Sequence, residues 1–165
     1  VILTEIQYRI PINNSKYKSG VVTEKFEIII PKINLQSQVI PDVDPFNKNE
    51  YLNALSKGVA HAKDTALPGE EGNVFIFGHS TDVPFNVARL NAVFYLINKL
   101  KPGDEIKLSY NGKGYKYIVN STTIIGSKEV NYLQNNSKSR TLTLMTCWPP
   151  GTTFKRLLVT GLLAD

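Results

Sequence analysis

The sequence predicts a mainly β domain whose strands form a closed or nearly closed barrel, with one or two short helices. Strand-like runs outnumber helix-like runs, and they recur at short intervals with Pro, Gly and Asn turn signals between them, a pattern typical of barrels. A length of 165 residues suits one domain with a single core. The hydrophobic content of 42% and the charged content of 20% are those of a globular chain.

The N-terminal part combines an irregular polar segment with two short strands. We interpret residues 1–24 as an N-terminal extension and residues 25–165 as the domain itself. Residues 26–31 and 33–40 are rich in Ile and Val, and the second run alternates apolar and polar residues with period two. Because proline lacks an N–H group, Pro31 limits the first strand to a sheet edge or a strand end.

The middle of the chain predicts a helix, a loop and an apolar strand. Residues 49–57 read as a short helix that Gly58 stops. His61 follows in surroundings that resemble a loop. The Leu-Pro-Gly turn at residues 67–69 then leads into an apolar strand over residues 73–79, which ends on Gly78-His79.

The C-terminal half predicts one longer helix and four strands. Residues 87–100 place apolar side chains on one face at helical spacing. Residues 105–110 and 115–125 form a hairpin, because the Asn-Gly pair between them suits a two-residue turn. The last two predicted strands cover residues 140–146 and 156–163.

Charge and hydropathy exclude two classes of function. The net charge is +5, but the basic residues are spread along the chain, which favours an ordinary solvated surface over a nucleic-acid groove. Tyr115-Lys116-Tyr117 pairs aromatic and basic residues only as an alternating strand does. The longest apolar runs fall far short of the ~20 residues that cross a bilayer. We therefore predict no nucleic-acid partner.

Cys147 is the only cysteine of the chain, so an intramolecular disulfide is excluded. It lies at the end of a predicted strand, next to the Pro- and Gly-containing loop that starts at Trp148. A rigid strand end followed by a loop is a common setting for reactive side chains. A lone thiol can also be an inert, buried small hydrophobe, so two interpretations of Cys147 stay open.

Three other residues could support a reactive thiol. His79 ends a buried strand, where an imidazole can face a cleft or be satisfied by backbone groups. His61 favours a structural role. Arg156 starts the strand after Cys147, so antiparallel pairing would bring the two to one rim, where a guanidinium stabilises an oxyanion or favours the thiolate.

The segment Thr-Leu-Met-Thr-Cys at residues 143–147 matches the TLxTC signature of the sortase family. Arg156 has the place of the family's arginine on the next strand, and Gly78-His79 resembles the end of the strand that carries its histidine. The turn at residues 67–69 and the segment at residues 100–104 are also similar, so the resemblance covers nearly the whole predicted domain. It implies a closed eight-stranded sortase barrel.

The resemblance implies a cysteine transpeptidase of the bacterial cell surface. Cys147 would attack a Leu-Pro-x-Thr-Gly-like sorting signal between Thr and Gly. His79 would act as acid and base, and Arg156 as oxyanion partner. An amine of a peptidoglycan precursor, or a Lys of another surface protein such as a pilin, would resolve the thioester. The substrate-binding candidates are Thr146, as a hydroxyl beside the reacting carbonyl, and Trp148, as a groove wall or equally a packing residue.

Further expectations concern class, anchoring, metals and a lid. The Trp-Pro-Pro-Gly sequence after Cys147 resembles the pilus-building and housekeeping sortases more than the best-known anchoring class. Because the sequence begins at Val1, we expect that an N-terminal region carrying a membrane anchor has been removed. Asp64, Glu70 and Glu71 are too few for a calcium cage, so we predict no metal or other cofactor. The Asp-Pro-Phe at residues 44–46 reads as a lid motif or as a plain loop.

Two other functions remain open at the level of sequence. A cysteine protease or acyl hydrolase would use the same Cys-His pair and let water resolve the thioester. A binding module without catalysis would keep Cys147 buried and inert.

Overall fold

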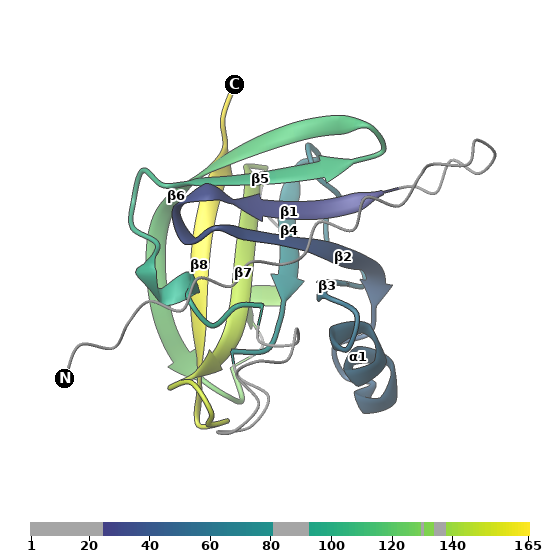
Figure 1. Ribbon diagram of the computed structural model, residues 1–165, viewed down its shortest axis with the longest axis vertical. Helices are drawn as coiled ribbons and strands as arrows, with labels where there is room; N and C mark the ends of the chain where they lie inside the picture. Colours follow the sequence, from purple (N-terminus) through teal and green to yellow (C-terminus); the bar gives the residue numbers. More distant parts are fainter. Residues whose placement is uncertain (1–24, 81–92, 130, 134–137) are drawn as a thin grey trace.

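The described part of the chain is a closed β-barrel. The computed structural model describes residues 25–80, 93–129, 131–133 and 138–165. Its strands are hydrogen-bonded in the order β1-β2-β3-β4-β7-β8-β6-β5 (Figure 1). They are β1 (Phe26–Ile30), β2 (Leu35–Val43), β3 (Val59–Ala62), β4 (Gly72–Phe77), β5 (Glu105–Tyr110), β6 (Lys113–Gly126), β7 (Arg140–Trp148) and β8 (Lys155–Leu163). The predicted mainly β, closed eight-stranded barrel is confirmed, whereas the predicted extension at residues 1–24 lies outside the described residues.

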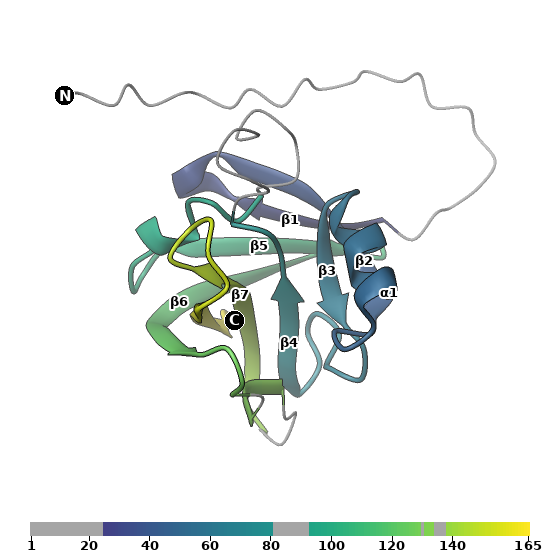
Figure 2. The ribbon, with the colours of Figure 1, turned by 90° about the horizontal axis from the view of Figure 1, so that it is seen from below.

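The helical elements are short. The α-helix α1 (Lys48–Leu55) begins after Asn47, whose side chain accepts a hydrogen bond from the Glu50 N–H and caps the helix. Figure 2 shows α1 beside β2 and β3, on the outside of the barrel. The 3-10 helices are η1 (Pro31–Ile33), η2 (Ile97–Lys99) and η3 (Asn131–Leu133). Pro31 thus ends β1, as its missing N–H predicts.

Two of the strand pairs are parallel, and one of them decides where the site lies. β2 pairs with β3 in parallel, and β4 pairs with β7 in parallel, with Phe77 opposite Met145. Parallel neighbours end at the same rim of a barrel. The residues that follow β4 and the last residues of β7 therefore meet at one end.

Side chains alternate between the barrel interior and its outer face along these strands. The interior cluster contains Val74 and Ile76 of β4 and Leu142 and Leu144 of β7. A second cluster lies on the opposite face of β3, β4 and β7. Its buried members are Val43, Ala54, Leu55, Ala60, Ala62, Phe75 and Phe77, with Tyr51, Tyr132 and Met145 packed against them. By alternation Cys147 shares the outer face with Met145, whereas Thr146 faces inward.

The predicted hairpin is present as β5 and β6. Asn111 and Gly112 have φ angles of 50° and 76°, which is the left-handed backbone that the turn requires. Tyr110 pairs with Lys113 directly across this turn.

Two sequence predictions are wrong in the described residues. His61 lies on β3 and not in a loop; the strand is buried throughout, so it lacks the alternation that reveals a half-exposed strand. The described part of the predicted helix at residues 87–100 forms a turn followed by η2. There Phe94, Ile97 and Leu100 are buried at intervals of three, a spacing that a 3-10 turn satisfies as well as an α-helix.

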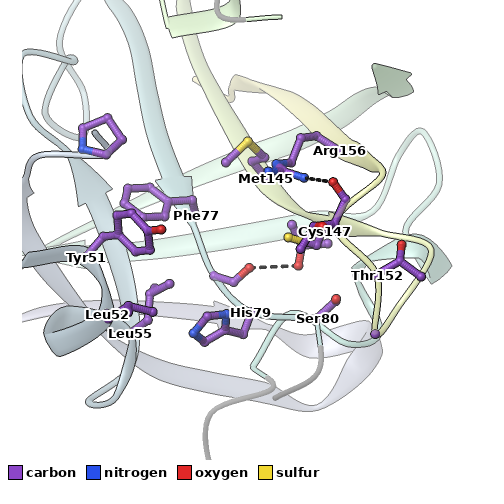
Figure 3. Close-up of a pocket in the computed structure, with 15 residues that line it drawn as sticks. Tyr51, Leu52, Leu55, Phe77, His79, Ser80, Met145, Cys147, Thr152 and Arg156 are labelled. Atoms are coloured by element: carbon purple, nitrogen blue, oxygen red, sulfur yellow. Dashed lines mark hydrogen bonds between the residues drawn. The ribbon is translucent and has the colours of Figure 1, made fainter. Parts of the chain in front are cut away.

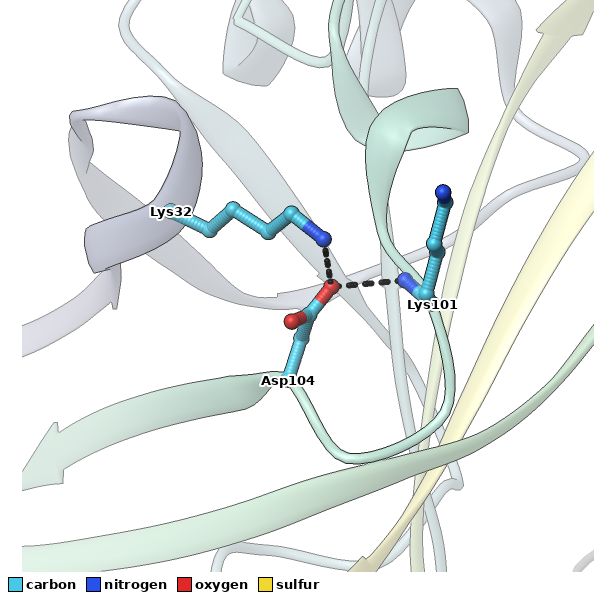
Figure 4. Close-up of polar contacts among 3 residues, drawn as sticks. All are labelled: Lys32, Lys101 and Asp104. Carbon is cyan, nitrogen blue, oxygen red and sulfur yellow. Dashed lines mark hydrogen bonds and ion pairs between the residues drawn. The ribbon is translucent and has the colours of Figure 1, made fainter.

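An exposed carboxylate joins η1 to the turn before β5. Figure 4 shows the Asp104 side chain accepting two hydrogen bonds on one oxygen, from the Lys32 Nζ and the Lys101 N–H, both at 2.7 Å. The hydrogen bond from Lys32, more than any other contact, lowers the pKa of Asp104. These bonds fasten the β1–β2 connection to the start of β5.

Candidate active site

A pocket of about 460 Å³ opens where β4, β7 and β8 meet α1. Figure 3 shows its lining, with Cys147 near the centre, Arg156 on one side of it and His79 on the other. The lining residues are Pro45, Tyr51, Leu52, Leu55, Phe77, Gly78, His79, Ser80, Met145, Thr146, Cys147, Gly151, Thr152, Thr153 and Arg156. All three predicted catalytic residues therefore border one cavity.

Cys147 and Arg156 are cross-strand partners. They lie opposite each other in the antiparallel pair of β7 and β8, and residues directly opposite on one face have Cβ atoms about 4.5–5.5 Å apart. Cys147 is a free, partly exposed thiol. The sequence-based expectation that strand pairing brings both residues to one rim agrees with this register.

The Arg156 guanidinium is held by the backbone of its own loop. Its Nη1 donates to the carbonyl oxygen of Thr153 at 3.1 Å and to that of Lys155 at 3.0 Å. A guanidinium has two further nitrogens that can donate. The arginine is thus fixed beside the thiol while retaining atoms suited to an oxyanion.

His79 is the second residue after the end of β4, and it is partly exposed. By alternation it shares the outer face with Phe77. Its carbonyl oxygen accepts a hydrogen bond from the Phe94 N–H at 3.0 Å. The backbone around the imidazole is thus held by hydrogen bonds, at Gly78 to Met145 and at His79 to Phe94.

Thr146 is 2% exposed, and its hydroxyl donates to the Gly78 carbonyl oxygen at 2.8 Å. The sequence suggested that this hydroxyl lies beside the reacting carbonyl of a substrate. The structure instead turns it toward the barrel interior, onto the backbone next to His79. The residue belongs to the site, but its hydroxyl has a protein partner.

Trp148 and His61 lie away from this pocket. Trp148 packs against the interior cluster and is not among the described residues that line the pocket, which favours its packing alternative. His61 is 3% exposed. Its Nε2 donates to the Ala66 carbonyl oxygen at 3.0 Å, and its Nδ1 accepts from the Asp42 N–H at 3.4 Å. Burial lowers the pKa of this imidazole, so the neutral form is favoured.

Sequence reasoning missed the apolar wall of the pocket. Tyr51, Leu52 and Leu55 of α1 line it together with Phe77 and Met145. The signal was present, because Tyr51 and Leu55 are one helical turn apart in a predicted helix. What the sequence did not reveal is that this face of α1 borders the thiol.

The segment at residues 44–46 leads directly into α1. The Phe46 N–H donates to the Asp44 side chain at 2.9 Å, and the Asp44 N–H donates to Glu50 at 2.9 Å. Pro45 lines the pocket, while Phe46 is 73% exposed. The tripeptide forms a capped turn on the pocket rim.

No group of three or more His, Cys, Asp or Glu side chains in the described residues could hold a metal ion. Of the acidic residues considered from sequence, Glu70 accepts a hydrogen bond from the Leu67 N–H at 3.0 Å and so caps its own turn.

The sequence matches the Sortase domain family over residues 28–164. This chain belongs to the sortase family. The closed eight-stranded barrel is thus the sortase fold. Sortases as a family are cysteine transpeptidases.

Relatives of this sortase carry class A, class C and class D names. Sortase D of Bacillus subtilis (strain 168) is 27% identical over 135 residues, a match that covers 80% of this chain and 60% of the relative. The chain therefore spans less than two thirds of that relative's length. Sortase C-1 of Actinomyces oris shares the fold with a TM-score of 0.72 at 29% identity, covering 87% of this chain and 76% of the other.

A third relative was solved with a peptide motif. Sortase C of Clostridium perfringens, in the structure with the C-terminal cell wall sorting motif, has a TM-score of 0.70 and 30% identity. The match covers 84% of this chain and 69% of that chain. In the described residues of this sortase, no helix has both the length and the apolar character to span a membrane.

Proposed function

We propose that this sortase cleaves a Leu-Pro-x-Thr-Gly-like sorting signal between Thr and Gly and transfers the acyl group to an amine. What supports the proposal is that His79, Cys147 and Arg156, which carry the family's motif, line one pocket with an apolar wall. The relative from Clostridium perfringens solved with a sorting motif supports a peptide as the substrate class.

The first half-reaction forms a thioester. The sulfur of Cys147 bonds to the carbonyl carbon of the signal's Thr, and the bond to the Gly nitrogen breaks. The thiol proton passes through the His79 imidazole to the leaving amine, since imidazole can accept and donate a proton near neutral pH. Arg156 donates a hydrogen bond to the oxyanion that forms between these steps. Removal of one such donor typically lowers the rate by about 10²–10³-fold.

The second half-reaction releases the product. The acceptor amine attacks the thioester carbon, its proton passes to His79, and Cys147 leaves with a proton returned from the imidazole. The acceptor is an amine of a peptidoglycan precursor or a Lys of a pilin. We place the reaction at the bacterial cell surface, with a membrane anchor N-terminal to the barrel.

The deciding experiment follows a fluorogenic peptide carrying a sorting signal, with and without triglycine as acceptor. We expect a peptide–triglycine conjugate by mass spectrometry, and none with Cys147→Ala. Cleavage by water alone with every amine tried would instead identify an acyl hydrolase. A native thiol that resists iodoacetamide would contradict both catalytic assignments and support a binding module.

A further inference from the structure

Thr146 links the strand of the nucleophile to the backbone of the histidine. It precedes Cys147 on β7, and its hydroxyl donates to the Gly78 carbonyl oxygen at 2.8 Å, a bond drawn as a dashed line in Figure 3. The bond spans 68 positions of sequence. β4 ends at Phe77, so this side-chain bond extends the connection between the two strands beyond the regular ladder.

Gly78 is held from two other directions as well. Its N–H donates to the Met145 carbonyl oxygen at 3.1 Å. A Cβ atom at this position would lie 2.9 Å from a ring carbon of Phe94 and 2.9 Å from a methyl carbon of Val59. Both distances are shorter than the distances that Cβ atoms keep from other atoms in proteins. Glycine therefore fits beside Phe94 and Val59, where a larger residue would force these side chains to shift.

Phe94 completes the restraint on the histidine. Its side chain is 0% exposed beneath Gly78, and its N–H donates to the His79 carbonyl oxygen at 3.0 Å. The N–H and the carbonyl of Gly78 and the carbonyl of His79 therefore all have partners. Two of these three partners, Met145 and Thr146, belong to the residues just before Cys147.

The inward direction of Thr146 argues against a contact with substrate. Thr146 is buried, whereas Cys147 is partly exposed on the opposite face of β7. A hydroxyl has one proton to donate, and here Gly78 receives it. Although Thr146 borders the pocket, a donor bond from its hydroxyl to an oxyanion would need this buried bond to break.

We propose that Thr146 is a positioning residue, whose hydroxyl fixes the backbone of His79 relative to the thiol of Cys147 without touching substrate. The proposal rests on the assignment of His79 as the acid and base. Misplacement of a catalytic group by about 1 Å can cost ~10²-fold in rate, so one buried hydrogen bond can control turnover here.

The test compares two substitutions at Thr146 with a matched control on the same strand. Thr146→Val replaces the hydroxyl with a methyl group, and Thr146→Ser keeps the hydroxyl. Thr143 is the control, because it is also buried on β7 and its hydroxyl donates to Asn73 at 2.9 Å, far from the His79 end. We expect Thr146→Val to lower kcat by about 10–100-fold with KM changed less than about threefold. Thr146→Ser recovers most of the rate, and Thr143→Val stays near the parent rate.

A second readout does not depend on turnover. The chain has two histidines, so a sample labelled with 13C-histidine gives two sets of imidazole signals. Thr146→Val is expected to move the His79 signals and its pH profile of kcat/KM, and to leave the His61 signals in place. A protein without transpeptidase activity would overturn the proposed function, while the His79 signals would still report on Thr146.

The opposite outcomes are equally clear. Parent-like kcat and unmoved His79 signals in Thr146→Val would overturn the positioning role. A loss of kcat with unmoved His79 signals would instead indicate a direct substrate contact. If Thr146→Val does not fold, Phe94→Leu tests the same device from the interior, with the same expected movement of the His79 signals, and their constancy in a folded Phe94→Leu would count against it.

Discussion

At the scale of single residues, the chemistry of the site depends on how each side chain is held. The Nη1 of Arg156 donates hydrogen bonds to two carbonyl oxygens of its own loop. These bonds fix the guanidinium plane beside Cys147. A lysine has a flexible stem and a compact charge in place of this planar fork. We therefore infer that the geometry of Arg156, and not its charge alone, is the feature that the proposed reaction uses.

We expect Arg156→Lys and Arg156→Ala both to lower kcat/KM for a sorting-signal peptide by about 10²–10³-fold. Lysine keeps the charge but cannot reach two carbonyls and an oxyanion together. Steady-state kinetics measure the effect, with Lys155→Ala as a neighbouring control that should change the rate little. A fully active Arg156→Lys enzyme would show that charge alone is sufficient.

His61 makes stability depend on pH. Burial lowers its pKa from the ordinary value of 6.5, so the unfolded chain binds a proton at a pH where the folded chain does not. The stabilisation is fully present above about pH 6.5 and is lost as the pH falls through the lower folded pKa. We expect the melting temperature to fall between pH 7 and pH 5, and His61→Gln to flatten this dependence.

The control for this measurement is the other histidine. His79→Gln should keep the loss of melting temperature toward acid, because His61 is unchanged in that variant. If the melting temperature of His79→Gln did not change with pH while that of His61→Gln still fell toward acid, the effect would belong to His79 and not to His61.

The sequence identified the chemical groups of the site better than it identified their contacts. Cys147, His79 and Arg156 stand out by type and by their place at predicted strand ends. The partner of the Thr146 hydroxyl could not be inferred, because it depends on the parallel register that sets Phe77 opposite Met145. That register arises from packing of the whole barrel and has no local signal.

At the scale of elements, the regular strands were predictable and the short buried pieces were not. The β5–β6 hairpin follows from its Asn-Gly turn, and β1 and β2 from their apolar runs. By contrast β3 is four residues long and wholly buried, so neither length nor alternation distinguishes it. Residues 93–100 pack against the interior core and do not form an α-helix. The Phe94 N–H donates to the His79 carbonyl oxygen and not to a carbonyl of a helix.

α1 contributes a wall whose role can be measured. Leu52 is 41% exposed and lines the pocket, whereas Leu162 on β8 is 43% exposed and is not among the described lining residues. We expect Leu52→Glu to raise KM for the peptide roughly 3–30-fold, because a charge replaces an apolar contact, with kcat little changed. Leu162→Glu is the matched control and should leave KM unaltered; equal effects of both would remove α1 from substrate binding.

The contact between η1 and the turn before β5 is a separate, electrostatic fastening. The hydrogen bond from Lys32 lowers the pKa of Asp104, so its stabilisation is present above the unfolded pKa and is lost as the pH falls through the folded one. Because the pair is exposed and screened, Asp104→Asn should lower the melting temperature by about 4 °C or less at neutral pH. High salt should shrink the difference, and a difference that grows with salt would contradict this account.

At the scale of the whole molecule, the interior cluster and most of the site occupy opposite faces of the same strands. Leu144 points into the barrel and is 0% exposed, whereas Met145 and Cys147 point outward into the pocket. Side chains of the site can therefore change without disturbing interior packing.

This separation predicts opposite patterns for two kinds of substitution. Cys147→Ala and His79→Ala should each lower turnover by about 10²–10⁴-fold or more with melting temperatures within a few degrees of the parent. Leu144→Ala should cost about 2–5 kcal/mol of stability. Calorimetry and the peptide assay together test this, and a large loss of stability in Cys147→Ala would mean that the thiol is part of the core.

The parallel pairing of β4 with β7 also determines when the chain becomes reactive. His79 and Cys147 are far apart in the sequence. The pairing of β4 with β7 brings their segments together. Before this pairing forms, Cys147 therefore has no histidine beside it. Under the proposed function, we therefore expect Cys147 to form a thioester only after the barrel has closed.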